Sequence, residues 1–119
     1  MTERLNASPS RRYGDLMNTY RYRGGKEIRY IVSHKRVKDM SRTEIANCPQ
    51  TDSIVDARKK AIAYIKRNKF YDAGIYDLKL GKEIGYVKME ILGNTPFSWN
   101  PEGGHTTALN KNGTLGKRW

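Results

Sequence analysis

Lysine and arginine are concentrated in two stretches of this sequence. Residues 21–42 carry eight of these cations against two acidic residues, and residues 51–70 carry six against two. Such side chains bind phosphate groups, and each contact releases a counterion that was condensed on a nucleic acid. We expect residues 21–42 to form the primary contact surface and the second stretch to form a further one. The candidate phosphate-binding residues are Arg21, Arg23, Lys26, Arg29, Lys35, Arg36, Lys38, Arg42, Lys59, Lys60, Lys66 and Arg67.

Aromatic rings are frequent enough to supply stacking surfaces for unpaired bases. The chain holds eight tyrosines and two tryptophans, and such rings stack on any base. Tyr20, Tyr22 and Tyr30 fall on the side of a predicted strand pair that faces the core, where we expect them to pack against apolar side chains. The stacking candidates are Tyr13, Tyr86 and Trp119.

The histidines and the cysteine do not form a pattern that predicts a metal site. His34 and His105 are not at metal-ligand spacing from each other, from Cys48 or from a pair of carboxylates. Cys48 follows a short apolar stretch and precedes a proline, so we expect a buried thiol. We therefore expect no catalytic residue, no metal and no cofactor, although the sequence leaves a Cys48 and His34 nucleophile–base pair open.

Two short strings resemble parts of nuclease motifs. The string GIY at residues 74–76, followed by GYV at residues 85–87, resembles the GIY-YIG nuclease family in its opening triplet, while the second triplet is out of order and closely spaced. Asp77 and Lys79 match the Asp-X-Lys half of restriction-type nucleases, whose metal also needs another acid. Because matches of three residues often arise by chance, a metal-dependent nuclease is the third hypothesis for function.

The first cationic stretch is predicted to lie on a β-hairpin over residues 16–32, around a Gly-Gly pair. A two-residue loop would pair Tyr22 with Glu27 and would mix apolar and charged side chains on both faces. A three-residue loop pairs Tyr22 with Ile28 and keeps the apolar side chains on one face. We therefore predict the three-residue loop, over residues 24–26.

Residues 52–69 are predicted to form the main helix. Ala57, Ala61 and Ile65 recur at the spacing of one helical face, and Ser53 suits the first turn. The opposite side of this helix carries its cations, so the helix packs inward and presents positive charge outward. The outward cations are Lys59, Lys60, Lys66 and Arg67.

A short helix is predicted just before the main one. Ser41 and Glu44 have the spacing of a capping box, in which each residue hydrogen bonds the backbone amide of the other. Pro49 ends this helix within two turns, because its ring clashes with the preceding turn.

A second hairpin is predicted over residues 74–92, with a two-residue turn at Gly81 and Lys82. This turn pairs Tyr76 with Val87 and places both on the core face. The same register places Asp77 on the open face, with Tyr86.

These elements predict an α+β fold with two layers, in which a four-stranded antiparallel sheet from two hairpins packs on one main helix in the order β-β-α-β-β. Residues 16–99 form this single domain, residues 1–15 a flexible basic arm and residues 100–119 a loosely ordered tail. The predicted core is Tyr20, Ile28, Tyr30, Val32, Ile54, Ala61, Ile65, Leu78, Val87, Met89 and Ile91. The hairpin and helix of residues 16–69 are loosely similar to sheet-reading DNA-binding modules such as the arm-binding segments of integrases.

Composition favours a polyanionic partner. The chain has 119 residues, a net charge of +11 and 37% hydrophobic residues, and a charge this large destabilises the compact state through self-repulsion. We expect a non-enzymatic protein that binds RNA or DNA, mainly through phosphates. The alternative is a small interaction factor, an inhibitor or accessory subunit with a phage-like character, whose basic face docks on an acidic protein or nucleoprotein.

The sequence predicts no contact with a membrane. Its apolar runs are at most five residues long, far short of the length that a membrane span needs. The single cysteine fits a reducing cytoplasm, where we expect the chain to act.

Overall fold

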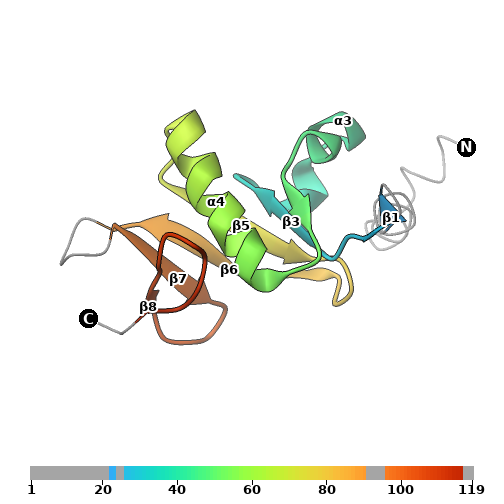
Figure 1. Ribbon diagram of the computed structural model, residues 1–119. Coiled ribbons are helices and arrows are strands. Elements are labelled where there is room, and N and C mark those ends of the chain that lie inside the picture. Colours follow the sequence, from blue (N-terminus) through green and yellow to red (C-terminus); the bar gives the residue numbers. More distant parts are fainter. Residues whose placement is uncertain (1–21, 24–25, 91–95, 117–119) are drawn as a thin grey trace, which may run out of the picture.

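A computed structural model of the chain describes residues 22–23, 26–90 and 96–116, with side chains from residue 28 onward. It contains a six-stranded antiparallel sheet in the order β4-β3-β5-β6-β7-β8, and a separate pair of strands, β1 and β2 (Figure 1). The strands are β1 (Tyr22–Arg23), β2 (Lys26–Glu27), β3 (Tyr30–Ser33), β4 (Gln50–Thr51), β5 (Asp72–Asp77), β6 (Lys82–Met89), β7 (Phe97–Pro101) and β8 (Thr107–Ala108). The helices are η1 (Val37–Asp39), α3 (Arg42–Ala46) and α4 (Ile54–Asn68).

The α+β class is as predicted, but the sheet has six strands in place of four. β1 does not join it. β4 joins β3 at one edge, and β7 and β8 extend the sheet beyond β6 at the other. The sheet therefore extends past residue 99, where the predicted domain ended.

The main helix forms where the sequence predicts it. Ser53 precedes α4, and its hydroxyl accepts a hydrogen bond from the backbone amide of Asp56 at 3.3 Å. This bond satisfies one of the amides that the first turn leaves without a helical partner. The helix ends at Lys69, which adopts the left-handed conformation common after a helix.

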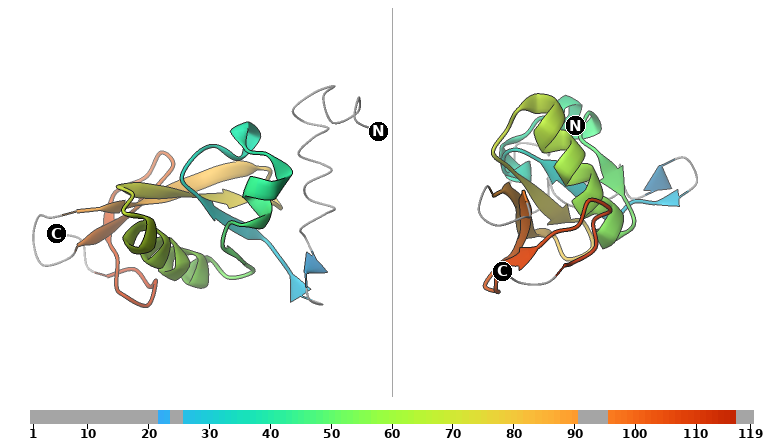
Figure 2. Two further views of the ribbon diagram at one scale, coloured as in Figure 1. Left: turned by 90° about the horizontal axis from the view of Figure 1, so that it is seen from above. Right: turned by 60° about the vertical axis from the view of Figure 1, so that its left-hand side comes forward.

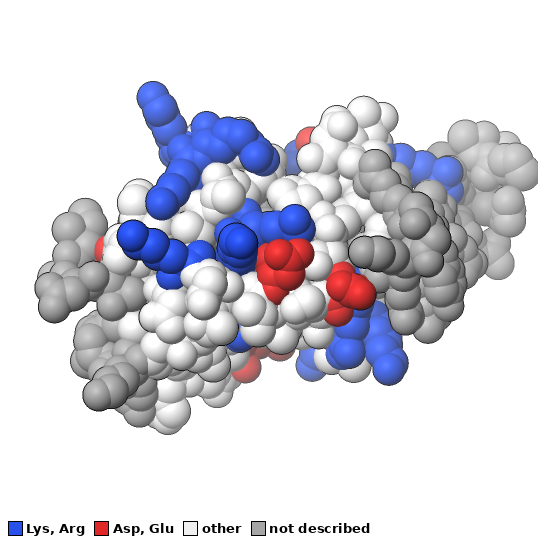
Figure 3. Space-filling model, in the orientation of Figure 1, with Lys and Arg blue, Asp and Glu red and all other residues white. Residues whose placement is uncertain are grey.

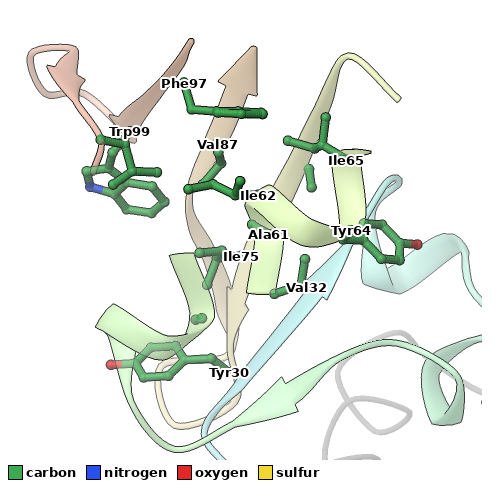
Figure 4. Close-up of a cluster of buried hydrophobic side chains, with 13 residues drawn as sticks. Tyr30, Val32, Ala61, Ile62, Tyr64, Ile65, Ile75, Val87, Phe97 and Trp99 are labelled. Atoms are coloured by element: carbon green, nitrogen blue, oxygen red, sulfur yellow. The ribbon is translucent and has the colours of Figure 1, made fainter. Parts of the chain in front are cut away.

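A first apolar core lies between α4 and one face of the sheet. Tyr30 and Val32 of β3 and Ile75 of β5 contribute to it. In Figure 4, Ala61 and Ile62 of α4 face the sheet strands. These side chains exclude water from one whole face of α4, which leaves its opposite face to solvent.

A second apolar core covers one end of the opposite face of the sheet. Ile31 and Tyr76 point into it from β3 and β5, and Val37 and Ile45 cover them from η1 and α3. Figure 2 shows α3 and α4 on opposite sides of the sheet. The molecule therefore has three layers at this end, where two were predicted.

Local capping explains why α3 forms. The hydroxyl of Ser41 accepts a hydrogen bond from the backbone amide of Glu44, and the Glu44 carboxylate accepts one from the amide of Ser41 at 2.8 Å. The predicted capping box is thus confirmed.

The predicted register of the first hairpin is wrong. Tyr22 pairs with Glu27, so the two-residue loop that we rejected is the one that forms. Ile28 leaves the strand pair and is buried in the second core, and β3 pairs with β4 and β5 instead of β1. Burial of Ile28 therefore decides the register.

The predicted register of the second hairpin is also wrong. Asp77 pairs with Lys82, which leaves a four-residue turn over residues 78–81. The carboxylate of Asp77 accepts hydrogen bonds from the turn amides of Lys79 and Leu80 at 2.9 and 3.2 Å. Because these bonds hold the turn, Asp77 is 1% exposed and does not lie on an open face.

The predicted core otherwise corresponds to the structure. Among the predicted residues, Tyr20 and Ile91 lie outside the described part of the chain, and Ile54 and Met89 are partly buried against the first core. Tyr76 and Val87 were expected on one face, but they enter different cores. The buried members are Ile28, Tyr30, Val32, Ala61, Ile65, Leu78 and Val87.

The chain after β7 contributes to the first core. Leu109 is buried in it, and the Nε of the buried Arg58 donates a hydrogen bond to the carbonyl of Gly113 at 2.8 Å. This segment therefore packs on α4, whereas a loose tail was predicted from residue 100. No helix in the described ranges is both long and apolar enough to cross a membrane.

Candidate nucleic-acid interface

Four predicted phosphate-binding residues lie together on the outward side of α4. We call Lys59, Lys60, Lys66 and Arg67 the α4 cationic face. Lys59 and Lys66 are seven residues apart, so they lie on one side of the helix and about 10 Å apart along its axis. Figure 3 shows Lys and Arg side chains gathered over α4, with acidic side chains beside its N-terminal end.

Most of this face is not neutralised by carboxylates. Lys60 Nζ lies 3.5 Å from the carboxylate of Asp56. Among the residues that the structure describes, Lys59, Lys66 and Arg67 have no carboxylate at ion-pair distance. These three side chains therefore keep their charge available to an external anion.

Two of these three cationic side chains lie over aromatic rings. Lys66 Nζ lies 5.8 Å from the ring centre of Phe97, and the Arg67 guanidinium lies 5.9 Å from that of Tyr64. These contacts restrict the long side chains without cancelling their charge.

Two cations of the first stretch, in contrast, are held by carboxylates. Arg29 Nη2 lies 2.9 Å from the carboxylate of Asp77, and Lys35 Nζ lies 2.8 Å from that of Glu44. The hydrogen bond from Lys35, followed by that from the Ser41 amide, lowers the pKa of Glu44 to about 2. A phosphate that binds Lys35 or Arg29 must compete with these internal partners.

The other described cations of the first stretch lie on the loop after β3, on η1 and on α3. Arg36 and Lys38 lie beside Glu83, and Arg42 is exposed on α3. Arg21 and the side chains of Arg23 and Lys26 lie outside what the structure describes. The structure therefore places four predicted cations on one helix, α4, whereas the five described cations of residues 21–42 lie on several elements.

A cleft opens on the face of the sheet opposite α4. Ile84 is the extra residue of a β-bulge, because Tyr76 pairs with Glu83 while Ile75 pairs with Gly85. The bulge puts Glu83 and Tyr86 on the same face, on either side of Gly74, which has no side chain. The resulting cleft has a volume of about 310 Å³.

Charges of both signs line this cleft. Lys35 and Arg36 line it together with Asp72, Glu83 and Glu102. Burial raises the pKa of Glu83, and Arg36 acts in the opposite direction. Tyr86, a predicted stacking candidate, is 41% exposed here, where three carboxylates and two cations surround it.

The nucleophile–base pair that the sequence left open does not form. The thiol of Cys48 donates a hydrogen bond to the carbonyl of Glu44 at 3.2 Å, and His34 Nδ1 lies 3.0 Å from the hydroxyl of Tyr64. Burial raises the pKa of the Cys48 thiol to about 11. Cys48 is therefore a protonated, buried thiol at neutral pH, as predicted.

The carboxylate of the Asp-X-Lys string is occupied as well. Asp77 is held by Arg29 and by two backbone amides. Within the described ranges, no group of three His, Cys, Asp or Glu residues is arranged to hold a metal ion.

Comparison with protein-family models, with curated proteins and with solved structures finds no match to this chain.

Sequence reasoning left three surface residues out of the predicted site. Lys69 directly follows α4, Tyr71 is 57% exposed two residues later, and Lys88 Nζ lies 5.4 Å from the ring centre of Tyr71. Lys69 could have been included from its place at the end of a cationic helix. The exposure of Tyr71 depends on how the chain turns into β5, which the sequence pattern does not show.

Proposed function

We propose that this chain is a non-enzymatic nucleic-acid-binding protein that contacts phosphates of RNA or DNA through the α4 cationic face. The observation that carries the proposal is the contrast in pairing. Lys59, Lys66 and Arg67 have no carboxylate at ion-pair distance among the described residues, whereas Arg29 and Lys35 each have one.

This arrangement suits phosphate contacts on physical grounds. An unpaired cation binds phosphate without first breaking an ion pair, and the counterions released from the nucleic acid supply the driving force. The helix fixes the spacing of the four cations, and its buried face anchors it to the sheet. Lysine and arginine that contact only phosphates position a protein on a nucleic acid without reading its bases. We therefore propose little sequence specificity.

The remaining predicted contacts belong to the same proposal. Arg21, Arg23 and Lys26 would add positive charge on the first hairpin, away from α4 along the chain. An acidic protein or nucleoprotein would be attracted by the same cationic face, so it is the alternative outcome of the test below. We place this function in the cytoplasm, because the chain has one cysteine, and it is a buried thiol.

Two double variants with the same change in net charge test the proposal. Lys59→Gln with Lys66→Gln removes charge from the α4 cationic face, while Lys79→Gln with Lys82→Gln removes it from the exposed turn before β6 and from the first residue of β6. Fluorescence anisotropy with labelled single strands and duplexes measures the affinity. We expect the α4 variant to bind about tenfold more weakly, equivalent to about 1.4 kcal/mol, and the turn variant to bind as wild type does.

Equal loss of affinity in both variants would contradict a localised interface. If the wild-type chain does not bind oligonucleotides but retains one acidic protein at moderate salt, the interaction-factor alternative replaces the proposal. Cleavage of the labelled strands in the presence of magnesium would show that the protein is an enzyme.

A further inference from the structure

Lys69 is the only residue other than glycine that has a positive φ in the described part of the chain, with φ 60° and ψ 36°. Glycine is favoured in this conformation because it has no Cβ to clash with the following carbonyl. Glycine is also the commonest residue at this position after a helix. A lysine here therefore lowers the stability of the fold relative to glycine.

The conformation of Lys69 is imposed by its neighbours. The backbone amides of Lys69 and Phe70 both donate to the carbonyl of Ile65, the latter at 3.1 Å. The Phe70 ring stacks on His34, with ring centres 4.6 Å apart, and also contacts Tyr64. Any residue at position 69 must follow this turn.

No contact within the described part of the chain explains why position 69 is a lysine. Its side chain is exposed and has no carboxylate at ion-pair distance there. A residue kept in an unfavourable conformation without an internal partner points to an external one.

Tyr71 is exposed next to this lysine. Phe70 is partly buried against the first core, and Tyr71, the next residue, is 57% exposed. Lys88 Nζ lies 5.4 Å from the centre of the Tyr71 ring and 3.8 Å from the carboxylate of Glu90. Lys69 and Tyr71 are a cation and an aromatic ring separated by one residue. They match the two parts of a nucleotide, its phosphate and its base.

We propose that Lys69 and Tyr71 form a subsite for one unpaired nucleotide, with the phosphate on Lys69 and the base stacked on Tyr71. This inference rests on the proposed nucleic-acid binding and adds that the ligand is single-stranded at this point. Lys66 and Arg67, in the last turn of α4, continue the positive charge from the subsite along the α4 cationic face. A base within a duplex cannot stack on Tyr71, because neighbouring bases already cover both faces of that base.

Variants of these two residues test the subsite. Lys69→Gly should raise the midpoint of thermal unfolding by about 4 °C and should reduce the slope of log affinity against log salt for a single strand by about 0.7. Tyr71→Leu should weaken binding of an unlabelled single strand between fivefold and about a hundredfold, with no change for a duplex. Tyr71→Phe keeps the ring and should bind as wild type does.

Two results would overturn the subsite. If Lys69→Gly lowers the unfolding midpoint, the lysine serves the fold, for instance through the helix dipole. If Tyr71→Leu binds single strands as wild type does, the ring has no stacking role. In either case Lys59→Gln with Lys66→Gln would still weaken binding if the α4 interface is correct, so the two proposals fail separately.

Discussion

Arg29 and Asp77 form a bidentate ion pair that joins the start of β3 to the end of β5. Arg29 Nε donates to both carboxylate oxygens at 3.1 and 3.2 Å, and Nη2 donates to Oδ2 at 2.9 Å. The carboxylate is 1% exposed and the arginine side chain 36%. Since the same carboxylate holds the turn before β6, the pair couples the residue before β3 to the β5–β6 hairpin, which is distant in sequence.

Removal of Asp77 should therefore damage the fold strongly. Asp77→Ala removes the carboxylate that Arg29 binds and leaves two turn amides without this acceptor, so we expect a loss of about 3 kcal/mol in the free energy of unfolding. Arg29→Ala should cost less, about 2 kcal/mol, because the carboxylate keeps its two amide bonds. Urea denaturation measures both values. Equal stability of Asp77→Ala and wild type would show that the pair does not form.

Adjacent residues of α4 should separate stability from binding. Arg58 is 7% exposed, donates to the Gly113 carbonyl and lies over Trp99, whereas Lys59 is exposed. We expect Arg58→Ala to cost about 2–3 kcal/mol of stability through the lost packing and the unsatisfied carbonyl. Its affinity for nucleic acid, measured where the variant is folded, should match wild type. Lys59→Ala should keep the stability of wild type and bind nucleic acid more weakly. A loss of affinity in Arg58→Ala without one in Lys59→Ala would contradict this separation of stability from binding.

The pH dependence of α3 follows from Glu44. Its pKa is lowered to about 2, first by the hydrogen bond from Lys35, so its ionised form is favoured in the folded state. The stability that the ionised carboxylate contributes is fully present above the pKa of the unfolded state, near 4.5. This stability is lost as the pH falls toward 2. Glu44→Gln should therefore be less stable than wild type at pH 7, and the difference should shrink below pH 4.5. A difference that grows in acid would contradict the assignment.

Two glycines with positive φ should respond differently to alanine. Gly113 has a φ of 87° and lies against the backbone of α4 at Val55 and Lys59, whereas Gly103 has a φ of 72° and open space around it. Gly103→Ala should cost about 1 kcal/mol from backbone strain alone. Gly113→Ala should cost more, about 3 kcal/mol, because the added methyl group displaces the segment from α4. Thermal unfolding of the pair measures the difference, and equal midpoints would contradict the contact.

Local signals in the sequence were sufficient for α3 and α4. Ser53 and the apolar spacing of residues 54–65 predict α4, and the Ser41 and Glu44 spacing predicts α3, because these contacts lie within one or two turns. The outward cations of α4 could be predicted for the same reason.

Long-range contacts decided the parts that the sequence did not predict. The burial of Ile28 and the ion pair of Asp77 set the registers of the two hairpins, and both depend on residues far along the chain. β7 and β8 follow segments rich in Gly, Asn, Thr and Pro, which resemble loops in isolation. The neutralisation of Arg29 and Lys35 could not be predicted either, since net charge does not reveal pairing.

The salt dependence of binding tests the central claim most directly. If the four cations of the α4 cationic face each contact a phosphate, log affinity for a duplex should fall against log salt with a slope of about −3.6. A variant with all four residues changed to glutamine should lose nearly all of that slope. A slope that is unchanged in this variant would show that other residues carry the phosphate contacts and would contradict the account.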